Sequence, residues 1–139
     1  MLAVGSGPCV GAIGAALAGG HGRLQGKWGL TQDAIKSLRV VLANGTALDV
    51  TAKQNTDLWY AMRGAGQNFG IVVSAVLDTY PQTKNGMHYN GDMIMNGTQV
   101  EKVFELFNSM IPDWPAELAV DVLFAAIPGT LTVSISLAV

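Results

Sequence analysis

The sequence has little charge. Asp, Glu, Lys and Arg make up 13% of its 139 residues, whereas hydrophobic residues make up 50%. An ordinary soluble domain has roughly 25% charged residues. A small domain exposes much surface per unit volume, so a self-contained one should need more charge to cover itself. We therefore expect the chain to be an internal fragment of a larger protein whose remainder covers its apolar faces.

Other features that direct function are also scarce. The net charge of -2 and pI near 5.5 leave no basic surface for nucleic acid or for a membrane. One cysteine excludes an internal disulfide, and with two histidines it makes a metal site unexpected. We expect that cysteine, Cys9, to be buried, as free cysteines commonly are. Glycines interrupt the apolar N-terminal region, so we expect neither a signal peptide nor a transmembrane helix.

The first 30 residues hold more than half of the 17 glycines. Glycine is found where backbone approaches closely or takes a positive φ. We expect a short strand at Leu2-Ala3-Val4, a turn over 5–8, and a helix of small residues over 10–17 that ends at Gly19-Gly20.

The middle of the chain predicts a hairpin, a helix and a strand. Residues 37–42 are β-rich, Asn44-Gly45 is a strong turn signal, and 46–50 returns. A helix is expected over 56–63, ending at Gly64, and a strand over 71–77, ending before Tyr80-Pro81.

A polar stretch over 82–90 marks the expected domain boundary. After it come a short strand over 93–95 and an amphipathic helix over 99–111, with Thr98 and Glu101 as its capping box. Two apolar β runs, 118–127 and 131–139, are expected to form a hairpin.

The turn Gly5-x-Gly7 before a small-residue helix suggests dinucleotide binding. The spacing argues against a Rossmann site, because Val10 occupies the third glycine position and no strand ending in an acid follows at about 20 residues. A second cluster, Gly19-Gly20-His21-Gly22, follows within one helix length. The two turns either let backbone lie along an extended cofactor or are plain turns.

Two long motifs carry a family resemblance. The run from Gly5 through Gly19-Gly20-His21-Gly22 to Trp28-Gly29-Leu30-Thr31-x-Asp33 is similar to the FAD-domain segment of berberine-bridge-enzyme-like oxidases. The run from Asp57 to Val72 matches a second signature of that family, so the resemblance covers about residues 4–81. A helix and hairpin over 82–139 is what the start of the family's substrate domain looks like.

The resemblance implies an α+β fold. Residues 1–81 would be the C-terminal part of a PCMH-type FAD-binding domain, and residues 82–139 the truncated start of an α+β substrate domain. The cofactor would be FAD, and the parent protein would oxidise an alcohol, sugar or related small molecule with oxygen as acceptor. It would be secreted, and of the two Asn-Gly-Thr sequences, at Asn44 and Asn96, the second is expected to be the better glycosylation site.

By match to the family motifs, the residues that would contact FAD are Gly5, Ser6, Gly7, Val10, Gly11, Gly14, Gly19, Gly20, His21, Gly22 and Ile71. Asp57, Arg63 and Asn68 are expected to be structural, as helix cap, helix-end charge and turn residue. Trp28 and Trp59 are expected in the core rather than stacked on substrate.

The resemblance gives this sequence no catalytic residue and no covalent link to the flavin. The family's tyrosine and acid near the flavin ring lie in C-terminal segments, and its histidine attachment point lies in an upstream phosphate-binding segment. Its cysteine attachment point aligns with Gly7, two residues before Cys9. The alternatives are a non-catalytic chain that does not hold FAD, acting at most as an interaction module, and a Rossmann-type nucleotide binder.

Overall fold

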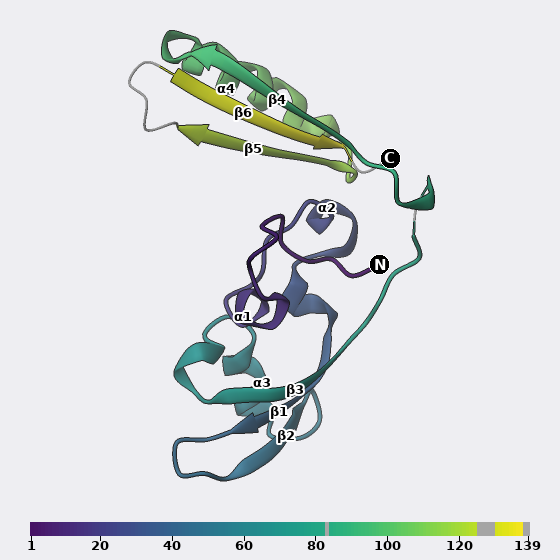
Figure 1. Cartoon of the computed structure of the whole chain (residues 1–139), viewed down its shortest axis with the longest axis vertical. Coiled ribbons are helices and arrows are strands. Elements are labelled where there is room, and N and C mark those ends of the chain that lie inside the picture. Colours follow the sequence, from purple (N-terminus) through teal and green to yellow (C-terminus); the bar gives the residue numbers. More distant parts are fainter. Residues whose placement is uncertain (83, 125–129, 138–139) are drawn as a thin grey trace. The chain divides into compact units, whose positions relative to one another are not determined.

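The chain folds into two compact units, Met1–Pro81 and Gln82–Val139. The computed structural model describes residues 1–82, 84–124 and 130–137 (Figure 1). Both units combine helices with antiparallel strands, which confirms the α+β class. None of the helices in these ranges is long and apolar enough to cross a bilayer.

Unit 1 is built on a three-stranded antiparallel sheet in the order β2-β1-β3. Its strands are β1 (Ile35–Val41), β2 (Ala47–Thr51) and β3 (Ile71–Leu77). Between β1 and β2, Gly45 has a φ of 82°, and the Asn44 side chain accepts a hydrogen bond of 3.0 Å from the Thr46 N–H. The predicted hairpin and third strand are thereby confirmed.

The helices of unit 1 are α1 (Ala12–Ala16), α2 (Gln25–Trp28) and α3 (Thr56–Met62). The 3₁₀ turns η1 (Thr31–Ala34) and η2 (Gly66–Asn68) lie between these elements and the strands. The predictions of α1 and α3 are confirmed, although α1 is shorter than predicted. The predicted strand at Leu2-Ala3-Val4 is wrong, because the Ala3 carbonyl bonds to the Thr31 hydroxyl rather than to a neighbouring strand.

The core of unit 1 lies on one face of the sheet. Alternation along β1 buries Leu38 and Val40 while Arg39 points outward and forms an ion pair of 2.8 Å with Asp49, its cross-strand neighbour. The buried cluster joins α1, α3, β1 and β2 through Ala16, Leu17, Ile35, Leu38, Val40, Val50 and Met62.

Unit 2 is a second three-stranded antiparallel sheet, in the order β4-β6-β5, with one longer helix. After a 3₁₀ turn, η3 (Lys84–Gly86), it comprises β4 (Tyr89–Asn96), η4 (Gly97–Gln99), α4 (Val100–Met110), η5 (Ile111–Asp113), β5 (Leu118–Phe124) and β6 (Thr130–Leu137). The predicted helix and the pairing of the last two strands are confirmed. The predicted ends of those strands, at 125–127 and 138–139, lie outside the described residues.

The predicted capping box of α4 is wrong. The side chain of Asn96, not that of Thr98, caps the helical segment by accepting a hydrogen bond of 3.0 Å from the Thr98 N–H. The 3₁₀ turn η4 moves the start of the segment back by one turn, so an asparagine that also ends β4 is placed at the cap.

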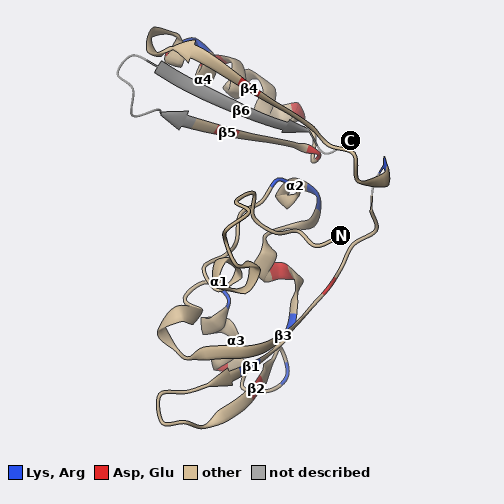
Figure 2. Cartoon of the chain, viewed as in Figure 1, with Lys and Arg blue, Asp and Glu red and all other residues tan. Residues whose placement is uncertain are grey.

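Among the side chains that the structure describes in unit 2, those before residue 123, one hydrophobic residue is buried. Val103 of α4 is buried against partly buried neighbours such as Met95, Phe107 and Val120. Beside α4, Met93, Leu106 and Met110 are among the residues that line an apolar groove of about 480 Å³. Figure 2 shows charged positions thinly scattered over both units, with no continuous block of one sign in the described part. The low charge of the sequence thus corresponds to apolar surface left uncovered.

We expect Leu38→Ala to lower the free energy of unfolding of unit 1 by about 2–5 kcal/mol, because it removes a buried side chain and leaves a cavity. Val73→Ala is the matched control: Val73 is 59% exposed on β3, and its truncation should change stability by about 0.5 kcal/mol or less. Urea unfolding followed by Trp28 and Trp59 fluorescence, in a Trp114→Phe background that silences unit 2, measures both. Equal losses for the two variants would place the core elsewhere.

Candidate cofactor-binding site

The first glycine-rich turn, residues 5–11, lies on the surface of unit 1 and leads into α1. The Val10 N–H closes it by donating to the Gly7 carbonyl at 3.2 Å. Ser6, Gly7 and Val10 are exposed. Cys9 is exposed as well. The expectation that Cys9 is buried is therefore wrong, because the turn packs through its backbone and leaves its side chains outside.

The second turn, residues 19–22, follows the end of α1. Gly19 and Gly20 have φ values of 108° and 80°, in the left-handed region where glycine alone is free of strain. Both are buried, whereas His21 is exposed, with its Nδ1 3.0 Å from Oε1 of Gln25. The chain reverses here and returns beside the first turn.

The two turns touch through their main chains. A Cβ added to Gly22 would lie 2.2 Å from the Val4 carbonyl oxygen, and one added to Gly5 would lie 3.3 Å from the His21 carbonyl oxygen. Any side chain at position 22 would therefore push the turns apart. The predicted residues from Gly5 to Gly22 are thus brought together on one part of unit 1.

Thr31, at the start of η1, links the two turns from inside. It is 1% exposed, and its hydroxyl lies 2.8 Å from the Ala3 carbonyl oxygen and 3.0 Å from that of Gly20. Its N–H also donates to the Gly20 carbonyl at 2.9 Å, and the Gln32 N–H donates to that of Gly19 at 3.0 Å. The sequence predicts no role for Thr31, although its position two residues before Asp33, which bonds to the Leu30 N–H, is a signal of a structured turn.

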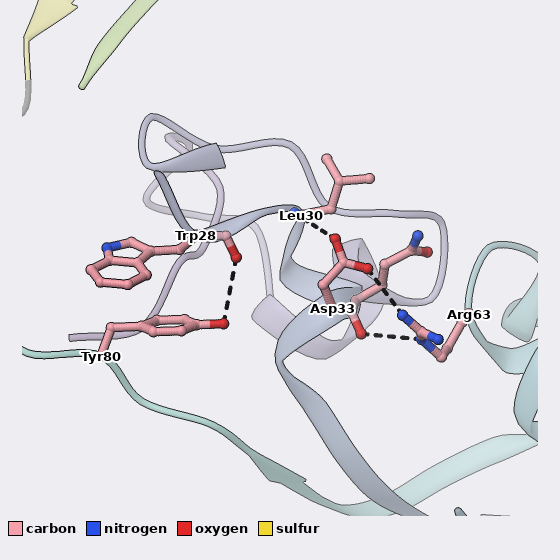
Figure 3. A network of polar contacts seen from close by, with 6 residues as sticks. Trp28, Leu30, Asp33, Arg63 and Tyr80 are labelled. Atoms are coloured by element: carbon pink, nitrogen blue, oxygen red, sulfur yellow. Dashed lines mark hydrogen bonds and ion pairs between the residues drawn. The ribbon is translucent and has the colours of Figure 1, made fainter. Parts of the chain in front are cut away.

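An ion pair holds η1 in place. Asp33 accepts a hydrogen bond of 2.9 Å from the Leu30 N–H and pairs with Arg63 at 3.0 Å (Figure 3). Arg63 also donates to the Gln32 carbonyl at 3.4 Å and lies over the Trp59 ring. Arg63 is structural, as predicted.

The second family signature also supports α1. The Leu17 carbonyl, at the end of α1, accepts hydrogen bonds of 3.1 Å from the N–H groups of Gly64 and Gly66. Asn68 is a turn residue, as predicted, and its side chain donates to the Ala65 carbonyl. The expectation that Asp57 caps α3 is wrong: Asn55 occupies the cap position and Asp57 lies in the first turn.

The two tryptophans of unit 1 are partly buried. Trp59 packs against the core cluster. Trp28 stacks on Tyr80 with ring centroids 4.4 Å apart, and the Tyr80 hydroxyl donates to the Trp28 carbonyl at 3.4 Å (Figure 3). The expectation of a core position is supported for Trp59, whereas Trp28 stacks on Tyr80 and is not among the residues of the core cluster.

Two glycines of the site have no role in packing. A Cβ added to Gly11 or Gly14 would meet no atom within 4 Å, and both residues are exposed. Gly14 lies inside α1, where glycine is about 1 kcal/mol less favourable than alanine. The outer side of α1 is therefore open to close approach by a ligand. The arrangement fits an extended cofactor such as FAD, laid along the backbone of the turns and α1.

Ile71 stands apart from the other predicted residues. It opens β3, its side chain is 71% exposed, and none of the hydrogen bonds within the described residues joins it to either turn. Its contact with FAD stays a prediction, as do those of the glycine-rich residues. In the described part, no three His, Cys, Asp or Glu side chains cluster as metal ligands would.

Comparisons with known proteins agree on a family. A family model described as an FAD binding domain matches residues 1–51. An FAD-linked oxidoreductase of Aspergillus niger is 40% identical over 118 residues, covering 85% of this chain and 25% of that protein. One of Pyricularia oryzae is 49% identical over 102 residues, covering 73% of this chain and 20% of that protein.

Solved structures give the same result. Physcomitrella patens BBE-like 1 superposes with a TM-score of 0.85 at 29% identity, over 100% of this chain and 30% of that one. A chitooligosaccharide oxidase superposes with a TM-score of 0.81 at 29% identity, over 100% of this chain and 29% of that one. The chain thus spans 25% of the Aspergillus relative and 30% of the Physcomitrella structure. With its FAD-binding segment and this fold, the chain belongs to the berberine-bridge-enzyme-like FAD-linked oxidoreductases.

Proposed function

We propose that the protein with this chain is an FAD-dependent oxidoreductase that oxidises an alcohol, a sugar or a related small molecule, with oxygen as the acceptor. The observation that carries the proposal is the pair of glycine-rich turns held together beside the open side of α1. The match of residues 1–51 to an FAD binding domain supports it. Similar structures that are named as chitooligosaccharide and xylooligosaccharide oxidases favour a sugar-like substrate.

The residues of this chain serve to bind and orient the cofactor. Gly11 and Gly14 let it approach α1, and hydrogen bonds from Thr31 and Gln32 to the Gly20 and Gly19 carbonyls hold the second turn at a fixed position. When bound, FAD supplies the hydride acceptor, and oxygen then takes the electrons to give hydrogen peroxide. Unit 2 is proposed to begin the substrate-binding part, and no catalytic residue is assigned to it.

The Rossmann alternative has no support in the fold. A Rossmann site follows a strand of a parallel sheet, whereas here the turn follows residues without strand structure and the sheet is antiparallel. A chain that holds no FAD is the remaining alternative, and ligand titration distinguishes the three.

We expect the 139-residue chain to bind FAD with a dissociation constant weaker than about 1 μM, or not at all, because a chain that spans a quarter of its relatives holds part of the contacts. Quenching of flavin fluorescence measures the affinity, with NAD as competitor. Displacement by NAD would favour the Rossmann alternative, and no binding at all would favour the non-catalytic one. Submicromolar affinity would contradict the expectation of a partial site.

The oxidase activity is tested on the native protein from its source. Anaerobic addition of an oligosaccharide or alcohol substrate should bleach the flavin absorbance, and admission of air should restore it with one hydrogen peroxide per turnover. A native protein whose reduced flavin is reoxidised by a quinone but not by air would refute oxygen as the acceptor and leave the FAD-dependent oxidation standing.

Substitution of two glycines should distinguish a residue required for FAD binding from a residue required for folding. Gly14→Ala should stabilise the chain by about 1 kcal/mol through helix propensity and weaken FAD binding. Gly22→Ala should destabilise unit 1, because its Cβ would lie 2.2 Å from the Val4 carbonyl oxygen. Thermal melts and FAD titration measure the pair. A Gly14→Ala chain that binds FAD as well as the original would remove α1 from the proposed site.

We expect no covalent flavin on Cys9. Cys9 is exposed, but it lies two residues after Gly7, the position that aligns with the family's attachment point. Moving the thiol two residues along the turn displaces it by several ångströms, up to about 7 Å in extended chain, away from the position of the attachment point. Native protein is denatured, precipitated and digested, and flavin absorbance is measured on the peptides. A flavin peptide that contains Cys9 would show that the first turn is misaligned.

A further inference from the structure

We propose that Thr31 is a positioning residue whose hydroxyl fixes the two glycine-rich turns relative to each other, so that they present one surface to the cofactor. This inference rests on the proposed function for its cofactor. We call the pair of contacts from the Thr31 hydroxyl to the Ala3 and Gly20 carbonyls the tie. The tie is a property of unit 1 alone and is tested separately from FAD binding.

The hydroxyl contributes more to holding the segment before the first turn than to holding the second turn. Its single hydrogen faces two acceptors, the carbonyl oxygens of Ala3 at 2.8 Å and Gly20 at 3.0 Å. The Gly20 carbonyl has a second donor, the Thr31 N–H, at 2.9 Å. Within the described residues, the hydroxyl is the one hydrogen-bond donor to the Ala3 carbonyl, and Ala3 is buried. Ala3 lies two residues before the first turn, so loss of the hydroxyl would remove a polar link between the segment that leads into the first turn and the second turn.

At position 31 the hydrogen bond and the packing of the side chain can be tested separately. A Cβ added to Gly20 would lie 2.6 Å from the Thr31 Cβ, so the threonine side chain occupies the space beside that glycine. Valine has nearly the same shape and no hydrogen bond to give. Serine keeps the hydroxyl and lacks the methyl group. The two substitutions thus separate the hydrogen bond from the packing.

The position of Thr31 is in turn fixed from outside. Asp33 caps the Leu30 N–H, and Arg63 holds both Asp33 and the Gln32 carbonyl. The chain on either side of Thr31 is therefore anchored by groups that do not touch either turn. Because Thr31 is fixed in this way, its hydroxyl can hold the turns at one separation. A hydroxyl on a mobile segment would move together with the turns and would not fix their separation.

The turns linked by Thr31 include every predicted FAD-contacting residue except Gly14 and Ile71. A ligand that contacts both turns binds best when their separation is already correct, because ordering them on binding costs conformational entropy. We expect loss of the hydroxyl to weaken FAD binding about tenfold, the equilibrium effect of about one hydrogen bond.

The test compares Thr31→Val and Thr31→Ser, with Thr46→Val as a control at an exposed hairpin threonine. A nitroxide on Cys9, the single cysteine, reports the mobility of the first turn by electron paramagnetic resonance. Hydrogen exchange of the amides at positions 31 and 32 reports the second turn, because they donate to Gly20 and Gly19. Exchange in β1 reports the stability of the whole unit.

Thr31→Val should mobilise the nitroxide and speed exchange at 31 and 32 at least about tenfold. The exchange of β1 should stay unchanged, and Thr31→Ser and Thr46→Val should resemble the original chain. An immobile nitroxide, or exchange that rises equally in β1, would overturn the tie. FAD titration then tests its consequence: equal affinity for Thr31→Val and the original chain would refute the positioning role. If neither binds FAD, the proposed function of this segment fails, while mobility and exchange still decide the tie.

Discussion

The main chain at Gly22 approaches the Val4 carbonyl so closely that no side chain fits between them. This contact requires the chain to reverse sharply after α1, which Gly19 and Gly20 permit through their positive φ values. It also requires a polar link between segments that form no sheet with each other, and the Thr31 hydroxyl provides it. The placement of the first turn, of α1 and of the second turn all depend on this backbone contact.

The two family motifs form a single structure. The first supplies both turns and η1, and the second supplies α3 and the glycines that follow it. Gly64 and Gly66 bond to the end of α1 at Leu17, and Arg63 pairs with Asp33 in η1. Residues 63–66 of the second motif therefore support the first motif, whereas Ile71, also in the second motif, stays a predicted FAD contact.

Elements with strong local signals could be predicted from the sequence. The Asn44-Gly45 hairpin, α3, β3 and the amphipathic α4 follow from turn chemistry and periodicity. Each failure has a physical cause. Residues Leu2 to Val4 are held by a partner 28 residues away, which a local pattern does not contain. The predictions for Cys9 and the cap of α4 are wrong for local reasons: a tight turn leaves Cys9 exposed, and the 3₁₀ turn η4 shifts the cap to Asn96. The role of Thr31 could not be predicted from local patterns, because both carbonyl groups that accept its hydroxyl belong to other segments.

Two pairs of glycines in this chain differ in a way that bears on function. At Gly20 and Gly22 an added Cβ would come within 3 Å of the Thr31 side chain and of the Val4 backbone, so the fold itself requires glycine. At Gly11 and Gly14 an added Cβ would meet no atom within 4 Å. Gly11 is the N-cap of α1, where glycine is favoured, whereas Gly14 lies inside the helix and lowers its stability without packing against a neighbour. A residue that weakens its own helix and touches no neighbour in the described chain points to a group that approaches it from outside. We propose FAD as that group, because the segment matches an FAD binding domain.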